Sequence, residues 1–409
     1  MTLERARISK EFVALVALTT SLAAMSIDMM LPALSDIAAE FAPAHPNDRQ
    51  LVLTTFFVGL SLGQLVFGPL SDSIGRKAAL YSGIALFVLG GLCCALAPSF
   101  GLLLAGRALA GFGAAGPRIV AVAVVRDMHT GRAMAKVMSF VSSIFILAPL
   151  LAPALGQALL LVGSWRSIFW LLVVAASVDV AWFGLRQAET LPPTRRTPLS
   201  LGVVARALSE VLQNRITLSY TLAMGLIFGA FINYLTTSQQ VFQEQYGVGK
   251  LFPLYFGLLA AALGLASLAN AQLVMRLGMQ RLARFAGGAE CVFSVLFWLW
   301  AIAWQGHPPL WLFMACMLVC FFCNGVLFGN YTARALEPMG HIAGAAAAVT
   351  GSLSSLVSLA FGTPFGRAYD GSVLPIISSF VIASIGALVL TEGAEWLEHN
   401  KPRGAARQA

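Results

Sequence analysis

Runs of apolar residues, each about twenty residues long and separated by short polar connections, constrain the fold of this chain most strongly. A helix rises about 1.5 Å per residue, so about twenty residues cross the ~30 Å hydrocarbon core of a bilayer. The pattern predicts an all-α membrane protein with about twelve transmembrane helices. We expect these helices near residues 12–34, 51–70, 78–97, 101–125, 137–160, 167–187, 216–238, 251–274, 285–305, 309–332, 343–364 and 373–392.

The composition supports a membrane protein and argues against a soluble one. Of the 409 residues, 58% are hydrophobic and 11% are charged, whereas soluble proteins carry about 25% charged residues. A soluble domain of this length cannot bury so much apolar surface, because its surface shrinks too slowly with size. Lipid removes this difficulty, since it solvates the apolar side chains.

The basic residues lie mainly on one side of the predicted spans. Twenty of the 26 Lys and Arg residues fall in segments on the side of the termini, four fall on the other side, and Arg107 and Arg118 lie inside a span. Cytoplasmic loops carry such an excess. The net charge of +8 therefore indicates membrane orientation and not a nucleic-acid partner. We expect both termini in the cytoplasm and the chain in the inner membrane.

A long polar segment divides the predicted helices into two sets of six. It contains Pro192, Pro193 and Pro198 and several basic residues. A faint repeat relates Leu70–Lys77, after the second span, to Leu273–Gln280, after the eighth. Parallel six-helix repeats with a substrate path between them are a known transporter architecture. We expect two six-helix pseudo-repeats, with an N-terminal bundle at 1–187, a cytoplasmic linker at 188–215, a C-terminal bundle at 216–392 and a cytoplasmic tail at 393–409.

The connection between the second and third spans carries the pattern G-x-x-x-D-x-x-G-R-K. Gly68 would allow close helix approach, and Gly75 would allow a tight turn. Asp72 could accept hydrogen bonds from Arg76, which Lys77 follows, or from a helix N-terminus. A generic basic turn is the alternative. The pattern resembles the loop signature of the major facilitator superfamily, which implies that family's fold and a latch between its two halves.

Further motifs lie at Ser26–Leu34, Arg107–Gly111, Val125–Asp127, Ala148–Gly156 and Glu337–Gly344. They resemble those of the drug/proton antiporters of the Bcr/CflA group within this superfamily. The resemblance covers nearly the whole chain, and it implies proton-driven export of amphiphilic small molecules by alternating access. No ATP-binding P-loop pattern is present, so we expect no cofactor beyond the proton gradient.

The fifth predicted span resembles the antiporter motif of that group. It contains Pro149, Pro153 and Gly156, which favour a bent helix with a notch at the glycine. The family pattern G-P-x-x-G-G is here Ala152-Pro153-Ala-Leu-Gly156-Gln157, and Ala110 replaces the usual Gln of the fourth span. These residues form the predicted antiporter-like helix.

Two charges lie at matching depth in the first and fourth spans. Asp28 and Arg107 are each about six residues, or about 9 Å, from the outer ends of their helices. An unpaired charge at that depth is costly, so we expect the two side chains to pair. A proton and the substrate would then compete for Asp28, with Arg107 setting its proton affinity. A static salt bridge is the alternative.

Other polar residues inside the spans are candidates for the substrate cavity. Arg118 lies three turns after Arg107 on nearly the same face, where it would favour anionic or acceptor-rich substrates, or would extend toward the cytoplasm instead. Interhelical hydrogen bonding is the alternative for the amides. The predicted cavity residues are Met25, Met29, Arg118, Asn233, Tyr234, Asn324 and Asn330.

Three other functions remain as alternatives to drug export. A proton-coupled uptake symporter for a metabolite would use the same charges. A membrane enzyme is disfavoured, because the five histidines fall in loops or tails without catalytic spacing. A non-transporting sensor would need a large signalling domain. We expect small-molecule substrates, protons and the lipid bilayer as partners, no nucleic acid, no metal site, and a monomer.

Overall fold

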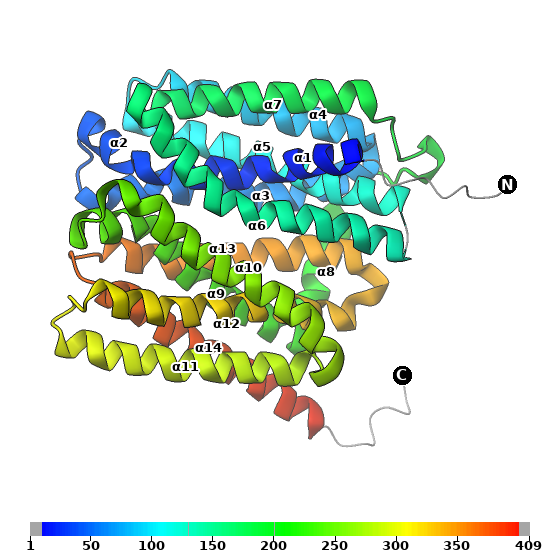
Figure 1. The fold of residues 1–409 in the computed structure, drawn as a ribbon. Helices are drawn as coiled ribbons and strands as arrows, with labels where there is room; N and C mark the ends of the chain where they lie inside the picture. Colours follow the sequence, from blue (N-terminus) through cyan, green and yellow to red (C-terminus); the bar gives the residue numbers. More distant parts are fainter. Residues whose placement is uncertain (1–9, 130, 200, 401–409) are drawn as a thin grey trace. The chain divides into compact units, whose positions relative to one another are not determined.

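The computed structural model describes residues 10–129, 131–199 and 201–400, and these residues form helices and connections without a strand (Figure 1). The helices are α1 Lys10–Asp28, α2 Leu34–Phe41, α3 Leu51–Ile74, α4 Arg76–Ala95, α5 Phe100–Met128, α6 Gly131–Val162, α7 Arg166–Arg186, α8 Leu201–Gln213, α9 Arg215–Gln239, α10 Phe252–Leu277, α11 Met279–Ala303, α12 Leu310–Leu336, α13 Ala343–Arg367 and α14 Leu374–His399.

The long helices agree with the twelve predicted spans. Ten described segments are long and apolar enough to cross a membrane. One of them, Leu310–Arg367, contains both α12 and α13. The 32 residues of α6 are also more than the roughly twenty that a span requires. The predicted fold class, an all-α membrane protein with about twelve spans, is confirmed.

Several spans extend beyond their predicted limits, among them α14, which continues to His399 in the predicted tail, and two further helices were not expected. The first apolar run was expected to end at Leu34, but a 3₁₀ turn at Leu31–Ala33 joins α1 to α2, which continues to Phe41. Pro32 lacks a backbone N–H, which accounts for the interruption. The second addition is α8, which lies within the predicted linker and was not expected as a helix.

The chain forms two compact units. The first comprises Met1–Leu201 with Leu235–Gly264 and Gly366–Gly371, and the second comprises Gly202–Tyr234, Leu265–Phe365 and Ser372–Ala409. These units are defined by packing in space, whereas the predicted halves are defined by a repeat in the sequence. The division into six-helix halves at 188–215 therefore stays a prediction.

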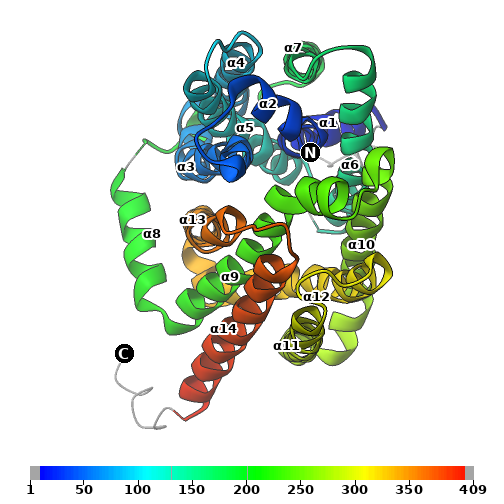
Figure 2. The ribbon, with the colours of Figure 1, turned by 90° about the vertical axis from the view of Figure 1, so that its left-hand side faces the viewer.

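Close helix packing in the first unit depends on glycines. Helix α5 packs against α3 and α4, and several helices of this unit are seen nearly end-on in Figure 2. A Cβ atom added to Gly111 would collide with the Phe56 carbonyl, and one added to Gly59 would collide with the Ala108 carbonyl. Small residues are common where membrane helices approach this closely. The glycines of α3 and α5 therefore set the spacing around the buried polar groups described below.

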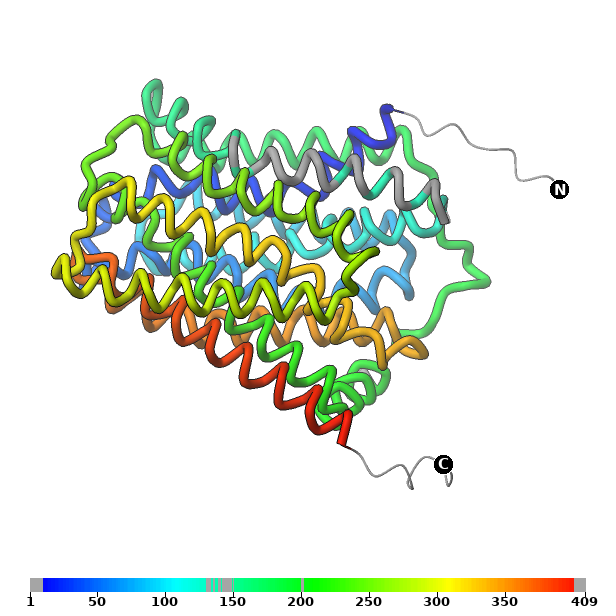
Figure 3. Tube along the Cα trace, turned by 60° about the horizontal axis from the view of Figure 1, so that its bottom comes forward, coloured from blue at the N-terminus to red at the C-terminus, as the bar shows by residue number. Residues whose placement is uncertain are grey.

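In the second unit α11 packs against α12 and α14, and Figure 3 shows these helices running side by side. Ala266 of α10, Leu282 of α11 and Val326 of α12 form a buried apolar cluster. Tyr234 contacts Phe321 edge-on, with ring centroids 4.8 Å apart. These contacts place the predicted cavity residues of this unit among packed helices.

Candidate functional site

The connection with the family signature is a one-residue break between two helices. Gly75 has φ of 101° and separates α3 from α4, which begins at Arg76. Residues other than glycine rarely adopt this conformation. A Cβ atom at Gly75 would also lie 2.7 Å from Oε2 of Glu189. Only glycine suits this turn, which directs the backbone N–H groups of Arg76 and Lys77 toward Glu189.

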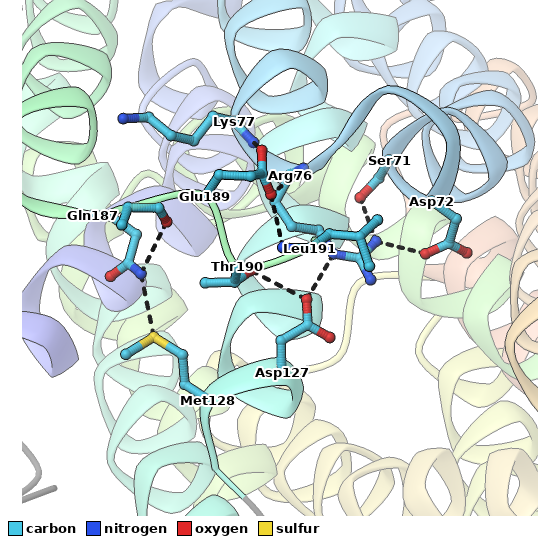
Figure 4. A network of polar contacts seen from close by, with 11 residues as sticks. Ser71, Asp72, Arg76, Lys77, Asp127, Met128, Gln187, Glu189, Thr190 and Leu191 are labelled. Atoms are coloured by element: carbon cyan, nitrogen blue, oxygen red, sulfur yellow. Dashed lines mark hydrogen bonds and ion pairs between the residues drawn. The ribbon is translucent and has the colours of Figure 1, made fainter. Parts of the chain in front are cut away.

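A set of charged side chains, here called the Arg76 network, converges at this turn (Figure 4). It consists of Ser71, Asp72, Arg76, Asp127 and Glu189. The Arg76 side chain is buried and donates from Nη1 to Asp72 Oδ1 at 2.5 Å and to Ser71 Oγ at 2.8 Å. Its Nε donates to Asp127 Oδ2 at 2.8 Å. One guanidinium therefore joins the ends of α3 and α5 at the start of α4.

Glu189, which sequence reasoning missed, completes this network from the segment after α7. Its carboxylate accepts hydrogen bonds from the backbone N–H groups of Arg76 and Lys77, both at 3.0 Å, and of Leu191 at 2.9 Å. Partial burial raises the pKa of Glu189, but these three bonds and nearby Arg196 outweigh it and hold the pKa below its usual value. Glu189 is thus an ionised cap on the N-terminus of α4.

A sequence signal for this cap did exist. Helix α4 begins with two basic residues, Arg76 and Lys77. The N-terminus of a helix favours negative charge, so these residues do not satisfy it. An acidic side chain from elsewhere in the chain is therefore expected at this N-terminus.

The other predicted residues of the motif lie nearby in sequence. Lys77 donates from Nζ to the Gly184 carbonyl at 2.9 Å, and Gly68 lies half-buried in α3.

Arg107 of α5 is fully buried and bonded to neutral groups. Its Nη1 donates to Ser26 Oγ at 2.8 Å, and its Nε donates to the Val52 carbonyl at 2.9 Å. Its guanidinium carbon lies 4.4 Å from the centroid of the Phe56 ring, within the range of a cation–π contact. Arg107 therefore connects α1 and α3 to α5.

Asp28 is the last residue of α1 and is 5% exposed. Among the described residues, none donates a hydrogen bond to its carboxylate, and it forms no ion pair. The contact expected between Asp28 and Arg107 is thus absent in this conformation. Equal depth fixes only the position along the membrane normal, and Ser26 and the Val52 carbonyl satisfy the guanidinium instead. The coupling role of these two residues stays a prediction.

The other predicted cavity residues of the first unit differ in exposure. Arg118 of α5 is exposed, and within the described ranges it has no ion-pair partner. Met25 is half-buried, and Met29 is fully buried. The Arg118 side chain is thus accessible and the Met29 side chain is not, and contact of either with substrate stays a prediction.

The three predicted asparagines of the second unit are buried and make interhelical hydrogen bonds. Asn233 donates to Ser379 Oγ at 2.9 Å, and Asn330 donates to Asn270 Oδ1 at 2.7 Å. With its amide nitrogen facing Glu290, Asn324 donates to both oxygens of that carboxylate at 3.2 Å. These contacts agree with the alternative of interhelical bonding, although a role in binding stays a prediction.

The predicted antiporter-like residues all lie in α6. Pro149 and Pro153 are inside the helix, and Pro153 is buried. Gly156 faces the end of α1, where an added Cβ atom would collide with the Met29 carbonyl. The glycine notch therefore brings α6 against the segment that carries Asp28.

A second polar set of the first unit, here called the Arg49 network, was not predicted. It consists of Ser35, Asn47, Asp48, Arg49, Gln50, Gln239, Gln240, Glu244 and Arg367. Arg49 is 8% exposed, and its two terminal nitrogens donate to the two oxygens of Glu244 at 2.7 and 2.9 Å. Arg49 also donates to Ser35 at 3.0 Å. The loop between α2 and α3 is thus held to the turn that follows α9.

Amide side chains extend this network to the end of α13. Gln50 donates to Gln240 Oε1 at 2.8 Å and to the Gly366 carbonyl at 2.9 Å. Arg367 donates to Asp48 at 2.8 Å. The bonded residues are about 190 to 320 positions apart in the sequence. No local motif could have revealed them.

Comparisons with known proteins identify the family. The sequence profile of the Major Facilitator Superfamily matches residues 16–391. A Bacillus subtilis (strain 168) protein named "Uncharacterized MFS-type transporter YdgK" is 34% identical over 382 residues, covering 91% of this chain and 93% of that protein. The "Bicyclomycin resistance protein homolog" of Haemophilus influenzae is 29% identical over 355 residues, covering 86% and 88%. The second name agrees with the Bcr/CflA group to which the motifs pointed.

A solved structure shows the same fold. The crystal structure of a POT family transporter in complex with 5-aminolevulinic acid aligns with a TM-score of 0.72 at 11% identity, covering 95% of this chain and 96% of that one. The matched proteins are transporters and not enzymes. This chain is therefore a multi-pass membrane transporter, and it belongs to the Major Facilitator Superfamily.

Proposed function

We propose that this transporter exports amphiphilic drugs in exchange for protons, by alternating access across the inner membrane. The similarity to a bicyclomycin resistance protein homolog supports drugs as the substrate class. The excess of Lys and Arg on the side of the termini supports cytoplasmic termini. The proton gradient is the driving force, and the transporter acts as a monomer.

The single observation that carries this proposal is the environment of Asp28. This carboxyl is buried at the end of α1 and has no ion-pair partner among the described residues. A carboxylate without a counter-ion is costly inside a membrane protein, whereas a protonated carboxyl is not. Asp28 can therefore bind and release a proton as its surroundings change, which is what coupling requires.

Arg107 supplies a fixed positive charge held against the same helix, α1. It bonds to Ser26, two residues before Asp28 on the same helix. A drug that enters beside Asp28 would change the distance or the solvation between the two charges, and would thereby change the proton affinity of the carboxyl. Proton release would follow drug binding.

The two charged networks lie on opposite sides of the membrane in the proposed topology. The Arg76 network follows the second span and lies on the cytoplasmic side, whereas the Arg49 network follows the first span and lies on the other side. Alternating access requires contacts on each side to form and break in turn. We assign the Arg76 network as the cytoplasmic latch and the Arg49 network as the opposing gate.

The experiment that tests this proposal uses everted membrane vesicles whose lumen is acidified by respiration. A pH-sensitive dye reports proton release while cationic, neutral and anionic drugs are added. We expect drug-dependent release in the wild type and background release in Asp28→Asn, because the amide cannot carry a proton. Asp36→Asn is the matched control, since Asp36 is exposed on the neighbouring helix α2.

Three other outcomes would contradict parts of the proposal. Full release by Asp28→Asn would place coupling at another residue. No release with any drug, together with proton uptake on addition of a metabolite, would identify an uptake symporter. Loss of release in Asp36→Asn as well would show that the substitutions act through folding.

A further inference from the structure

Helix α8 directly precedes a membrane span. It ends at Gln213, and only Asn214 separates it from α9, which begins at Arg215 and is a membrane span. The Asn214 side chain accepts a hydrogen bond from the Thr217 N–H at 3.0 Å and so caps α9. Figures 1 and 2 show α8 running across the direction of α9. Because this joint is short, α8 is held at the depth where the span begins.

The apolar face of α8 is only partly covered by protein. At 100° per residue, Ala205, Ala207, Leu208, Val211 and Leu212 fall on one half of the helix. Ala207 and Val211 are buried, whereas Leu208 is 40% exposed and Leu212 is 49% exposed. The helix thus presents a strip of exposed apolar side chains in addition to those that pack inward.

The polar face fixes the rotation of α8 and carries an available positive charge. Glu210 bonds to Nε2 of His341 at 2.8 Å, which ties this face to the segment between α12 and α13. Arg206 lies on the same face, is exposed, and pairs with no carboxylate within the described part of the chain. Arg215, at the joint, is also exposed. A polar face with an unpaired arginine opposite an apolar strip is typical of helices that lie in the membrane interface.

We propose that α8 is an interfacial helix that inserts Leu208 and Leu212 into the headgroup–acyl boundary and binds anionic phospholipid headgroups through Arg206 and Arg215. A guanidinium matches the phosphate oxygens of such a headgroup in shape and charge. The short joint to α9 and the unpaired guanidinium both favour lipid over a protein partner. This inference does not depend on drug export or proton coupling.

The test uses the full chain, with its six cysteines replaced, in phosphatidylcholine vesicles with or without phosphatidylglycerol. An environment-sensitive fluorophore is attached at Leu212→Cys, or at Gln213→Cys on the polar face as the matched control. We expect lipids with brominated chains to quench the Leu212 label, and aqueous iodide to quench the Gln213 label. Transport is not measured, so failure here is distinguishable from failure of the proposed function.

Phosphatidylglycerol should strengthen the quenching by brominated lipid. The fraction of phosphatidylglycerol needed for half of this effect should rise about fivefold in Arg206→Gln, since each basic side chain near an anionic surface contributes about that factor. It should remain unchanged in Arg206→Lys, which keeps the positive charge. Iodide quenching of both labels alike would overturn the proposal. Protection of the Leu212 label from both quenchers would assign the strip to a protein partner and would also overturn it. Quenching by brominated lipid without any effect of phosphatidylglycerol or Arg206→Gln would overturn the headgroup assignment.

Discussion

The Arg76 and Arg49 networks each provide partners for a buried arginine, but they connect different parts of the chain. Each surrounds a buried arginine, 3% exposed in one and 8% in the other. Arg76 is bonded to two carboxylates, Asp72 and Asp127, on helices that pack together. Arg49 has one carboxylate, that of Glu244, and its neighbours are bonded through amides to residues about 190 to 320 positions away.

This difference indicates what each network can control. The Arg76 network holds one group of helices and the segment after α7, so its loss should affect folding as well as transport. The Arg49 network holds a loop to segments remote in sequence, and half of the Glu244 side chain is exposed, at 46%. Its loss should shift a conformational equilibrium and leave the helices intact. The following changes test this contrast.

The largest effect should come from Arg76→Ala. Removal of the guanidinium leaves Asp72 and Asp127 without their shared counter-ion, and Ser71 loses its donor. Breaking a buried pair costs roughly 3–5 kcal/mol, and because Asp72 is half-exposed we expect about 3 kcal/mol. Thermal unfolding in detergent should show the loss of stability, and transport should fall with it.

Arg126→Ala is the matched control for this change. Arg126 lies next to Asp127 and is exposed, so its removal should alter stability by less than about 0.5 kcal/mol. Equal destabilisation by the two substitutions would mean that the Arg76 network has no special role in folding.

The fold could be predicted largely from the sequence, because lipid imposes a length on each span that hydropathy reveals directly. Helix α8 was missed since its 13 residues are too few for a span and lie in a segment that is polar overall. Its apolar positions recur every three or four residues, which would have revealed an amphipathic helix.

The candidate site was less predictable. Asp72, Gly75 and Arg76 belong to a local motif, and the structure brings them together. The expected contact of Asp28 with Arg107 depended on depth alone, whereas the direction of a long side chain is set by its neighbours, here Ser26 and Val52. The Arg49 network depends wholly on tertiary structure and left no signal in one sequence.

A smaller effect should come from Arg49→Ala. A hydrogen bond to a charged group contributes about 1.5–3 kcal/mol, and exposure of Glu244 reduces this to about 1 kcal/mol, or a fivefold change in the population of the opened conformer. Spin labels at the exposed residues Ala39 and Lys250, in a background without native cysteines, should report longer distances by electron spin resonance. Thermal stability should change little, in contrast to Arg76→Ala.

Arg166→Ala controls for the loss of any arginine pair near this network. Arg166 bonds to Glu40 at 2.6 Å, and both side chains are partly exposed. This pair joins α7 to α2 and does not involve the segments at Glu244 or Gly366, so the label distances should not change. A distance change in Arg166→Ala equal to that in Arg49→Ala would contradict the assignment of the Arg49 network as a gate.

The smallest effect should come from Glu189→Gln, and its dependence on pH distinguishes a charged cap from a neutral one. The pKa of Glu189 is lower in the folded protein than in the unfolded chain. The ionised form therefore stabilises the fold above the unfolded pKa, near 4.3, and this contribution is lost as pH falls through the folded pKa. We expect Glu189→Gln to lower stability by less than about 1 kcal/mol at neutral pH, because this side chain is largely exposed. The difference in melting temperature from the wild type should shrink toward pH 4, whereas a constant difference would show that the charge of Glu189 does not stabilise the start of α4.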